Sequence, residues 1–157
     1  MLRKRWIIGS LLGLAILWAG LVPAFAGDSL YGKVTAVKSP TVVTLDYGEG
    51  TYDVRLVGID APPAEPLASQ ARELLASFVL GKNARIRLEE SEKGELLVAR
   101  LFTDDPVLGI RDVGVELVKV GLAQRQKNYD YKYGELAAAE ETARAEKRGL
   151  WAQAQPK

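Results

Sequence analysis

Hydrophobic and polar residues alternate along five short segments of the chain, the pattern of β-strands that bury one face. Turn-forming residues separate the first three segments, at 38–40 and at 47–50, and a polar turn at 91–94 joins the last two. Because these connections are tight turns rather than crossover helices, the pattern favours a small closed barrel over a parallel sheet. The predicted strands are 30–37, 41–46, 51–59, 84–89 and 95–102.

Three other segments carry apolar residues at helical spacing and are followed by a glycine. They are 66–80, 113–120 and 133–148, with Gly81, Gly121 and Gly149 after them. The stretch 103–109 has no such pattern and is a predicted loop. The order of three strands, a helix, two strands and two helices is typical of an OB-type barrel. We therefore expect an α+β, mainly β fold: a five-stranded OB-type barrel with three helices, preceded by a signal peptide.

The first 26 residues differ in character from the rest of the chain. They begin with three cations, continue with an uncharged apolar stretch and end on Ala24-Phe25-Ala26, which supplies small residues for a cleavage site. This layout predicts a secretory signal peptide, residues 1–26, and one mature domain, 27–157. The competing interpretation is an uncleaved membrane anchor, because a spanning helix needs about 20 residues. In either case we expect an exported protein that is periplasmic, secreted or in another lumenal compartment.

The composition excludes several kinds of chemistry. The 157 residues include no Cys and no His, so a disulfide framework, a thiolate nucleophile, a Ser-His-Asp triad and an ordinary zinc site are ruled out. Any metal would be a hard cation held by oxygen ligands. Charged residues make up 26% and hydrophobic residues 48%, an ordinary globular composition that does not favour disorder or several membrane spans.

The charge balance bears on the expected partner. Lys and Arg number 21 against 20 Asp and Glu, and loss of residues 1–26 would remove three cations and leave 18 against 20, a net charge of −2. A protein that depends on phosphate contacts usually carries a basic patch or a positive balance. The balance therefore favours an unidentified protein partner, and nucleic-acid binding would need a local basic patch. A membrane contact would come only through an uncleaved signal peptide.

Three local strings resemble the staphylococcal nuclease (thermonuclease) family. The segment Val54-Arg55-Leu56-Val57-Gly58-Ile59-Asp60-Ala61-Pro62 is similar to its arginine strand and the Asp-x-Pro that follows. Gly121-Leu122-Ala123 and the Lys-Arg-Gly-Leu-Trp end of 143–151 are similar to its two C-terminal helices. The resemblance covers 30–151, and the fold it implies, a five-stranded OB barrel with three helices, agrees with the predicted elements.

The resemblance implies a phosphodiesterase site. Active members of the family are Ca²⁺-dependent nucleases in which two aspartates hold the metal, a glutamate acts as general base on water, and two arginines bind the phosphate. At the matching positions this chain has Arg55 as a phosphate-binding arginine and Asp60 as a metal ligand. The alternative is a structural role for both, as an ion pair or as supports of the loop that follows the strand.

Three family positions are not kept. Pro40 stands where the first metal aspartate is expected, Pro63 where the base is expected, and Glu95 where the second arginine is expected. Glu65 is the candidate substitute for the base, and Asp46 or Glu65 for the missing metal ligand. Loss of a general base alone lowers a rate by about 10²–10⁴. We therefore expect no cofactor, or Ca²⁺ if the site is catalytic.

A tyrosine-rich segment lies where the resemblance implies tyrosines near a bound nucleotide. Tyr129 and Tyr131 are the candidates for stacking on a base. The alternative is that they pack on one edge of the barrel with their hydroxyls in water.

The sequence thus predicts an exported nuclease-like domain that is catalytically impaired and acts as a binding or scaffolding module. The alternatives are a Ca²⁺-dependent endonuclease with an altered active site, and a non-catalytic single-strand binder that uses the tyrosines.

Overall fold

The computed structural model describes residues 29–91, 96–107 and 109–152. The predicted signal peptide and Glu95 lie outside the described residues. The strands are β1 (Ser29–Ser39), β2 (Val42–Asp46), β3 (Thr51–Leu56), β4 (Ile59–Asp60), β5 (Asn83–Ser91), β6 (Leu96–Asp105), β7 (Gly109–Asp112) and β8 (Gln124–Arg125). The helices are α1 (Leu67–Val79), α2 (Val113–Lys119), α3 (Glu135–Ala145) and the short 3-10 helix η1 (Gly149–Trp151).

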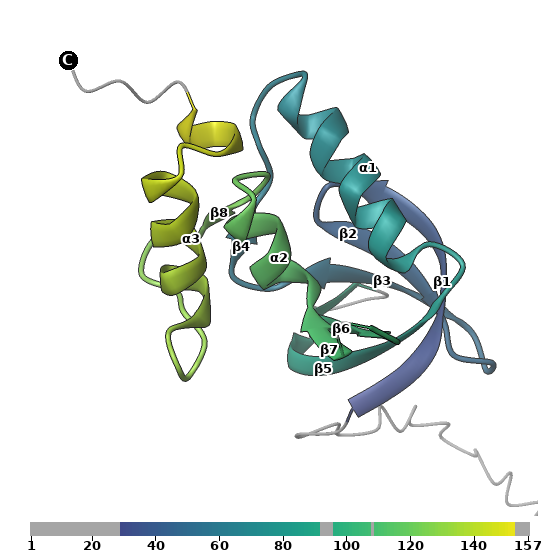
Figure 1. The fold of residues 1–157 in the computed structure, drawn as a ribbon. Helices are drawn as coiled ribbons and strands as arrows, with labels where there is room; N and C mark the ends of the chain where they lie inside the picture. The colour runs from purple at the N-terminus through teal and green to yellow at the C-terminus, as the bar shows by residue number, and fades with distance from the viewer. Residues whose placement is uncertain (1–28, 92–95, 108, 153–157) are drawn as a thin grey trace, which may run out of the picture.

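Five strands close into a barrel in the order β3-β2-β1-β5-β6, because β6 also pairs with β3. That closing pairing is parallel, whereas the other pairings around the barrel are antiparallel. β7 extends the sheet beyond the barrel by pairing with β6 (Figure 1). The predicted OB-type barrel of five strands with three helices is confirmed.

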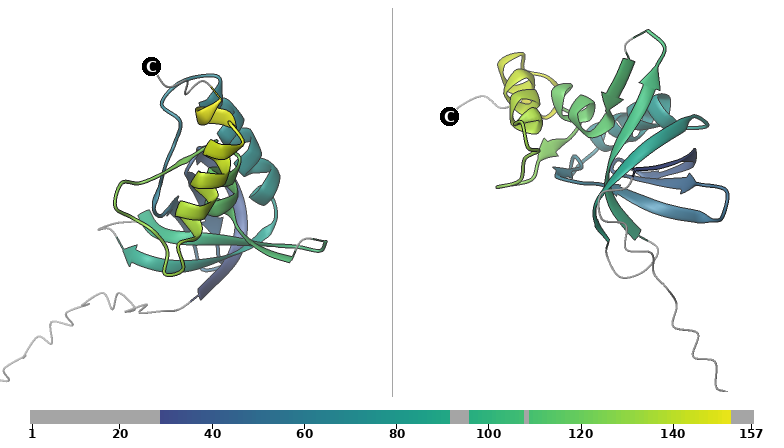
Figure 2. Two further views of the ribbon diagram at one scale, coloured as in Figure 1. Left: turned by 60° about the vertical axis from the view of Figure 1, so that its left-hand side comes forward. Right: turned by 90° about the horizontal axis from the view of Figure 1, so that it is seen from below.

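The core fills the barrel and continues under the helices. Alternate residues of the strands point inward, as the period of a β-strand requires, and are fully buried: Val34, Val43, Leu45, Val54, Ile86 and Leu101. Leu75 of α1, Leu117 of α2 and Leu136 of α3 belong to the same cluster. In Figures 1 and 2, α2 lies between the barrel and α3. Among the described helices, none is both long and apolar enough to cross a bilayer.

The third predicted strand, 51–59, is divided in the structure. β3 ends at Leu56, and Gly58 adopts a φ of 77°, a value that only glycine reaches readily. A Cβ on Gly58 would lie 2.3 Å from the ring of Tyr129, so this glycine also lets that ring approach the backbone. The chain then resumes as β4, which pairs with β8 in a second, two-stranded sheet. Periodicity alone gave no sign of this bend, because the residues on both sides are strand formers.

Two other boundaries differ from the sequence prediction. The predicted loop 103–109 is largely strand, because β6 runs on to Asp105 and β7 returns beside it. The last helix begins at Glu135 rather than at 133. Its first turn is capped by the carboxylate of Asp130, which accepts hydrogen bonds from the backbone N–H groups of Leu136 (3.1 Å) and Ala137 (3.3 Å). Helical spacing does not predict this cap, because Asp130 lies outside the helix, before its first residue.

Candidate functional site

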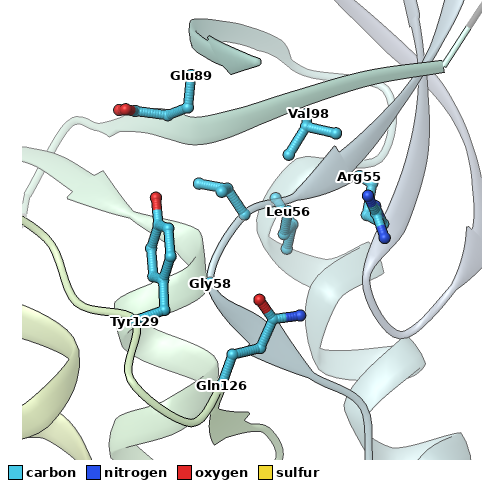
Figure 3. Close-up of a pocket in the computed structure, with 8 residues that line it drawn as sticks. Arg55, Leu56, Gly58, Glu89, Val98, Gln126 and Tyr129 are labelled. Carbon is cyan, nitrogen blue, oxygen red and sulfur yellow. The ribbon is translucent and has the colours of Figure 1, made fainter. Parts of the chain in front are cut away.

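A pocket of about 350 Å³ opens where the end of β3 meets β5, β6 and the loop after β8. Figure 3 shows Arg55 on one side of the pocket, and Tyr129 and Glu89 on the other. The pocket is therefore lined by three polar or charged side chains (Arg55, Glu89 and Gln126), by the phenol of Tyr129 and by apolar residues. The lining residues are Arg55, Leu56, Val57, Gly58, Glu89, Val98, Gln126 and Tyr129.

Arg55 is fixed in this pocket by the barrel itself. Its backbone lies between Val42 of β2 and Val98 of β6, the two neighbours of β3. The side chain is half-buried and lines the pocket. A guanidinium on a rigid strand is well placed to receive a phosphate, because its donors form a planar fork. The structure thus brings this predicted site residue to a pocket.

The turn that contains Pro40 lies next to Arg55. The carbonyl of Thr41 accepts a hydrogen bond of 2.8 Å from the backbone N–H of Leu56, the residue after Arg55. The position that the resemblance assigns to the first metal ligand is therefore close to the pocket. Pro40 offers no side-chain oxygen there, and the nearby Lys38 is held by Asp53 of β3 at 2.6 Å.

Asp60 lies at the same end of the barrel but is exposed and does not line the pocket. It pairs with Gln124 through the β4–β8 sheet. Its Oδ1 accepts a hydrogen bond of 2.9 Å from Nε2 of Gln126. Gln126 lines the pocket and was not among the predicted site residues. It follows the Gly121-Leu122-Ala123 string by three residues, and no spacing rule marks an isolated glutamine.

The other acidic candidates lie away from the pocket lining. Pro63 and Glu65 are exposed in the segment before α1. Oε2 of Glu65 accepts a hydrogen bond of 3.1 Å from the N–H of Ser69, and the hydrogen bonds from Ser69 lower the pKa of this carboxyl. Asp46 is at the far end of β2, opposite Thr51, whereas Arg55 is opposite Val42. Four residues of strand separate these positions by about 13 Å.

The two predicted stacking residues have different environments. Tyr129 is half-buried and lines the pocket. Tyr131 is 7% exposed, and its hydroxyl donates to the carbonyl of Val57 at 3.1 Å. The guanidinium carbon of Arg100 sits 3.7 Å from the centroid of the Tyr131 ring. A buried ring covered in this way offers little surface to a base, so Tyr129 is the stacking candidate that the pocket supports.

A buried charged cluster, which sequence reasoning missed, holds the tyrosine segment in place. Nε of Arg100 on β6 donates to Oδ2 of Asp112 at 2.7 Å, and its Nη2 lies 3.5 Å from Glu135. Asp112 caps α2 by accepting from the N–H of Val115. Burial opposes the charge of Arg100, but the hydrogen bond and the charge of Asp112 outweigh it and raise the pKa of Arg100. In the sequence, Arg100 is a charged residue between the apolar residues Ala99 and Leu101 of a predicted strand. That pattern was the sequence feature that could have indicated a buried charge.

The described residues do not fit a calcium site. Ca²⁺ takes six to eight oxygen ligands, usually including several carboxylates. In the part of the chain that the structure describes, no three Asp or Glu side chains are grouped so that they could hold a metal ion. Asp60 is already hydrogen-bonded to Gln126, and a proline occupies the partner position.

The Lys38–Asp53 pair predicts a small dependence of stability on pH. The hydrogen bond from Lys38 lowers the pKa of Asp53 below its ordinary value, and Thr44 adds a second one at 2.9 Å. Because Lys38 is 55% exposed, we expect a contribution below about 1 kcal/mol. A lowered folded pKa makes this contribution complete above about pH 4 and lost as the pH falls through the folded value.

The measurement is urea unfolding of the wild type and Asp53→Asn at several pH values from neutral down to about pH 3. The difference in unfolding free energy should shrink in the acid range. Asp104→Asn, at an exposed position, is measured beside it as the control for the loss of one carboxylate. A difference for Asp53→Asn that stays constant with pH would contradict the assignment.

Comparison with known proteins agrees with this architecture. Residues 53–153 match the family described as "Staphylococcal nuclease homologue". A protein of Verticillium alfalfae named "Probable endonuclease LCL3" is 34% identical over 116 residues, which cover 64% of this chain and 39% of that protein. Its namesake in Colletotrichum graminicola is 32% identical over 137 residues, 80% of this chain and 50% of that protein. The chain thus spans half or less of the length of these relatives. The closed barrel and the match over 53–153 show that the chain belongs to the staphylococcal nuclease-like family.

Proposed function

We propose that this chain is a nuclease-like domain that binds single-stranded nucleic acid in the Arg55–Tyr129 pocket and hydrolyses it poorly or not at all. The observation that carries the proposal is the composition of the pocket: a phosphate-binding type of side chain and a stacking type of side chain line it together. The residue in the position of the base is Pro63, which is exposed and does not line the pocket.

The binding half of the proposal follows from the chemistry of the two side chains. An arginine fork binds phosphate oxygens through charge-assisted hydrogen bonds. A tyrosine ring stacks on any base, because every base has a π-face, and each stack is worth about 1–3 kcal/mol. The two lie on opposite sides of one pocket (Figure 3), as the phosphate and base of one nucleotide require. The overall charge of the protein does not oppose this, because the contact is local.

The impairment of catalysis follows from the residue at the family's base position, which is Pro63. Glu89 is the one carboxylate among the described lining residues, and it lies on the Tyr129 side of the pocket, away from Arg55. Water attack on phosphorus needs a base within hydrogen-bond reach of the water, and loss of that base lowers the rate by about 10²–10⁴. Glu65, the substitute considered above, accepts its hydrogen bond from Ser69 and does not line the pocket.

We also propose that the protein is exported, because its first 26 residues have the pattern of a signal peptide. The protein partner expected from the charge balance would bind elsewhere on the surface.

A second candidate function is Ca²⁺-dependent endonuclease activity with an altered site. The observation that favours it is the name of two relatives at 32–34% identity, "Probable endonuclease LCL3". The same family fold and the same arginine would serve either function. The two candidates differ in whether bound nucleic acid is cleaved, so one experiment separates them.

Replacement of Arg55 by alanine is expected to weaken oligonucleotide binding about tenfold, because a charge-assisted contact to phosphate is lost. The measurement is fluorescence anisotropy of a labelled single-stranded oligonucleotide, with and without Ca²⁺, at fixed salt. Arg72→Ala is the matched control: it removes the same charge from an exposed position of α1 that does not line the pocket. Its affinity should stay close to that of the wild type.

The same samples are then examined for cleavage on a denaturing gel. Calcium-dependent cleavage that disappears in Arg55→Ala would establish the second candidate in place of the first. If the wild-type protein binds no oligonucleotide and cleaves none, neither candidate stands. Binding that depends on Arg55 without cleavage is the result that we expect.

A further inference from the structure

Glu89 lines the pocket at an irregularity in the barrel. On β5, Leu88 is paired with Ala99 and Glu90 with Val98, two adjacent residues of β6, so Glu89 is an extra residue in a β-bulge. Bulges re-aim a side chain and are common beside active sites. Here the bulge lies next to Val98, and both Glu89 and Val98 line the pocket. The family resemblance had assigned no role to this position.

Glu89 lies across one strand from Arg55. Arg55 of β3 pairs with Val98 of β6, and the bulge of β5 is on the other side of β6. Two strand spacings place the backbones of Arg55 and Glu89 about 10 Å apart. Figure 3 shows Glu89 on the Tyr129 side of the pocket, with the Tyr129 hydroxyl directed toward the same strand. The pocket therefore has a positive end and a negative end, separated on the scale of one nucleotide.

The carboxylate of Glu89 is oriented and still has accepting capacity. Nε and Nη2 of Arg87 both donate to its Oε1, at 3.3 and 3.0 Å. Within the described part of the chain, no hydrogen bond goes to Oε2 of Glu89. The Glu89 side chain is 30% exposed, so a ligand can reach it. A carboxylate with one oxygen accessible can accept hydrogen bonds from a ligand, and its negative charge repels phosphate groups.

We propose that Glu89 is a specificity-determining residue that reads the edge of the base stacked on Tyr129 and selects guanine over uracil or thymine. Guanine presents two adjacent donors, N1–H and N2–H, which match the two lone pairs of Oε2, the Glu89 oxygen that Arg87 leaves open. Uracil and thymine present one donor between two carbonyl oxygens, which a carboxylate repels. Proteins read single-stranded nucleic acids through such base edges. This inference rests on the proposed binding of a nucleotide with its phosphate at Arg55.

The experiment compares two labelled RNA pentamers in EDTA, a pentauridylate and the same strand with guanosine at the centre. Anisotropy titrations give both affinities for the wild type and for Glu89→Gln and Glu89→Ala. We expect the wild type to prefer the guanosine strand about tenfold, a typical value for a two-pronged base contact. In both variants the preference should fall to about twofold or less, with affinity for pentauridylate unchanged or higher, since a negative charge is removed. Glu73→Gln, at an exposed position of α1, should keep the wild-type preference.

The outcomes separate this inference from the proposed function. A preference that is absent in the wild type, or that persists in Glu89→Gln and Glu89→Ala, overturns the role of Glu89 even if binding still depends on Arg55. Absence of all oligonucleotide binding overturns both. Thermal unfolding of each variant shows that the fold is intact, which is expected because Glu89 is exposed and glutamine has the same shape.

Discussion

Replacement of Arg100 by alanine is expected to destabilise the protein by about 3–5 kcal/mol, because it leaves a buried carboxylate without its partner. Arg100 is 8% exposed, and its ion pair with Asp112 at 2.7 Å is equally buried. Burial already raises the pKa of Asp112, and the hydrogen bond and charge of Arg100 oppose that rise. Without the guanidinium, the pKa of Asp112 is expected to rise further. The stacked face of Tyr131 also loses its cation.

Chemical denaturation measures this change, with the midpoint and the slope both recorded. Arg87→Ala is the matched control, because Arg87 lies directly opposite Arg100 on the neighbouring strand but is 48% exposed. Its exposed ion pair should contribute less than about 1 kcal/mol. The double variant Arg100→Met with Asp112→Asn should be more stable than Arg100→Ala, since asparagine still caps α2 and no buried charge is left unpaired. Glu135, the other partner of Arg100, is 32% exposed and can be solvated. A loss below about 1 kcal/mol for Arg100→Ala would contradict a role of this ion pair in holding the fold.

Replacement of Gly121 by alanine is the second change with a large expected effect, a loss of about 2–6 kcal/mol in the free energy of unfolding. Gly121 has a φ of 73°, and a non-glycine residue held in this region costs about 1–3 kcal/mol. A Cβ there would also lie 2.3 Å from the carbonyl oxygen of Arg148. Relief of such a clash moves the backbone and typically adds about 1–3 kcal/mol. The contact cannot yield easily, because the N–H of Leu150 also donates to the Gly121 carbonyl at 2.9 Å.

The chain offers an internal control that separates the cost of the positive φ from the cost of the steric clash. Gly81 follows α1 with a nearly equal φ of 75°, but its Cβ would meet no atom within 4 Å. Gly81→Ala should therefore show the conformational cost alone, and Gly121→Ala that cost plus the clash. Unfolding free energies of the two variants, measured side by side, test this. Equal losses would mean that the segment after α3 moves away from Gly121 without cost.

The barrel was predictable from the sequence because its determinants are local. Alternation in β1, β2 and β5 reflects burial of one strand face, and helical spacing in α1 reflects burial of one helix face. The turn at 38–41 and the glycines after α1 and α2 are likewise short-range signals, whereas α3 ends at Ala145, before Gly149. These signals depend only on residues that are close in the sequence. The five strands and three helices therefore lie within a few residues of their predicted positions.

The site was predictable only in part. Arg55 and Tyr129 were singled out by resemblance, and the structure brings both to one pocket. Gln126 and Glu89 were not singled out. Glu89 reaches the pocket through a bulge, a mismatch between two strands that neither strand shows alone. The burial of Tyr131 under Arg100 likewise depends on a contact between β6 and the segment before α3.

The sequence by itself determined the family, the order of the elements, the absence of Cys and His chemistry, and the prolines at two positions of the expected site. The tertiary structure decided which acids and tyrosines share a cavity, which charge is buried, and where β3 breaks at Gly58. The physical reason is the sequence separation over which the interactions act. Periodicity and turn chemistry act between residues a few positions apart, whereas the pocket and the Arg100 cluster join β3, β5, β6 and the two C-terminal helices across the fold.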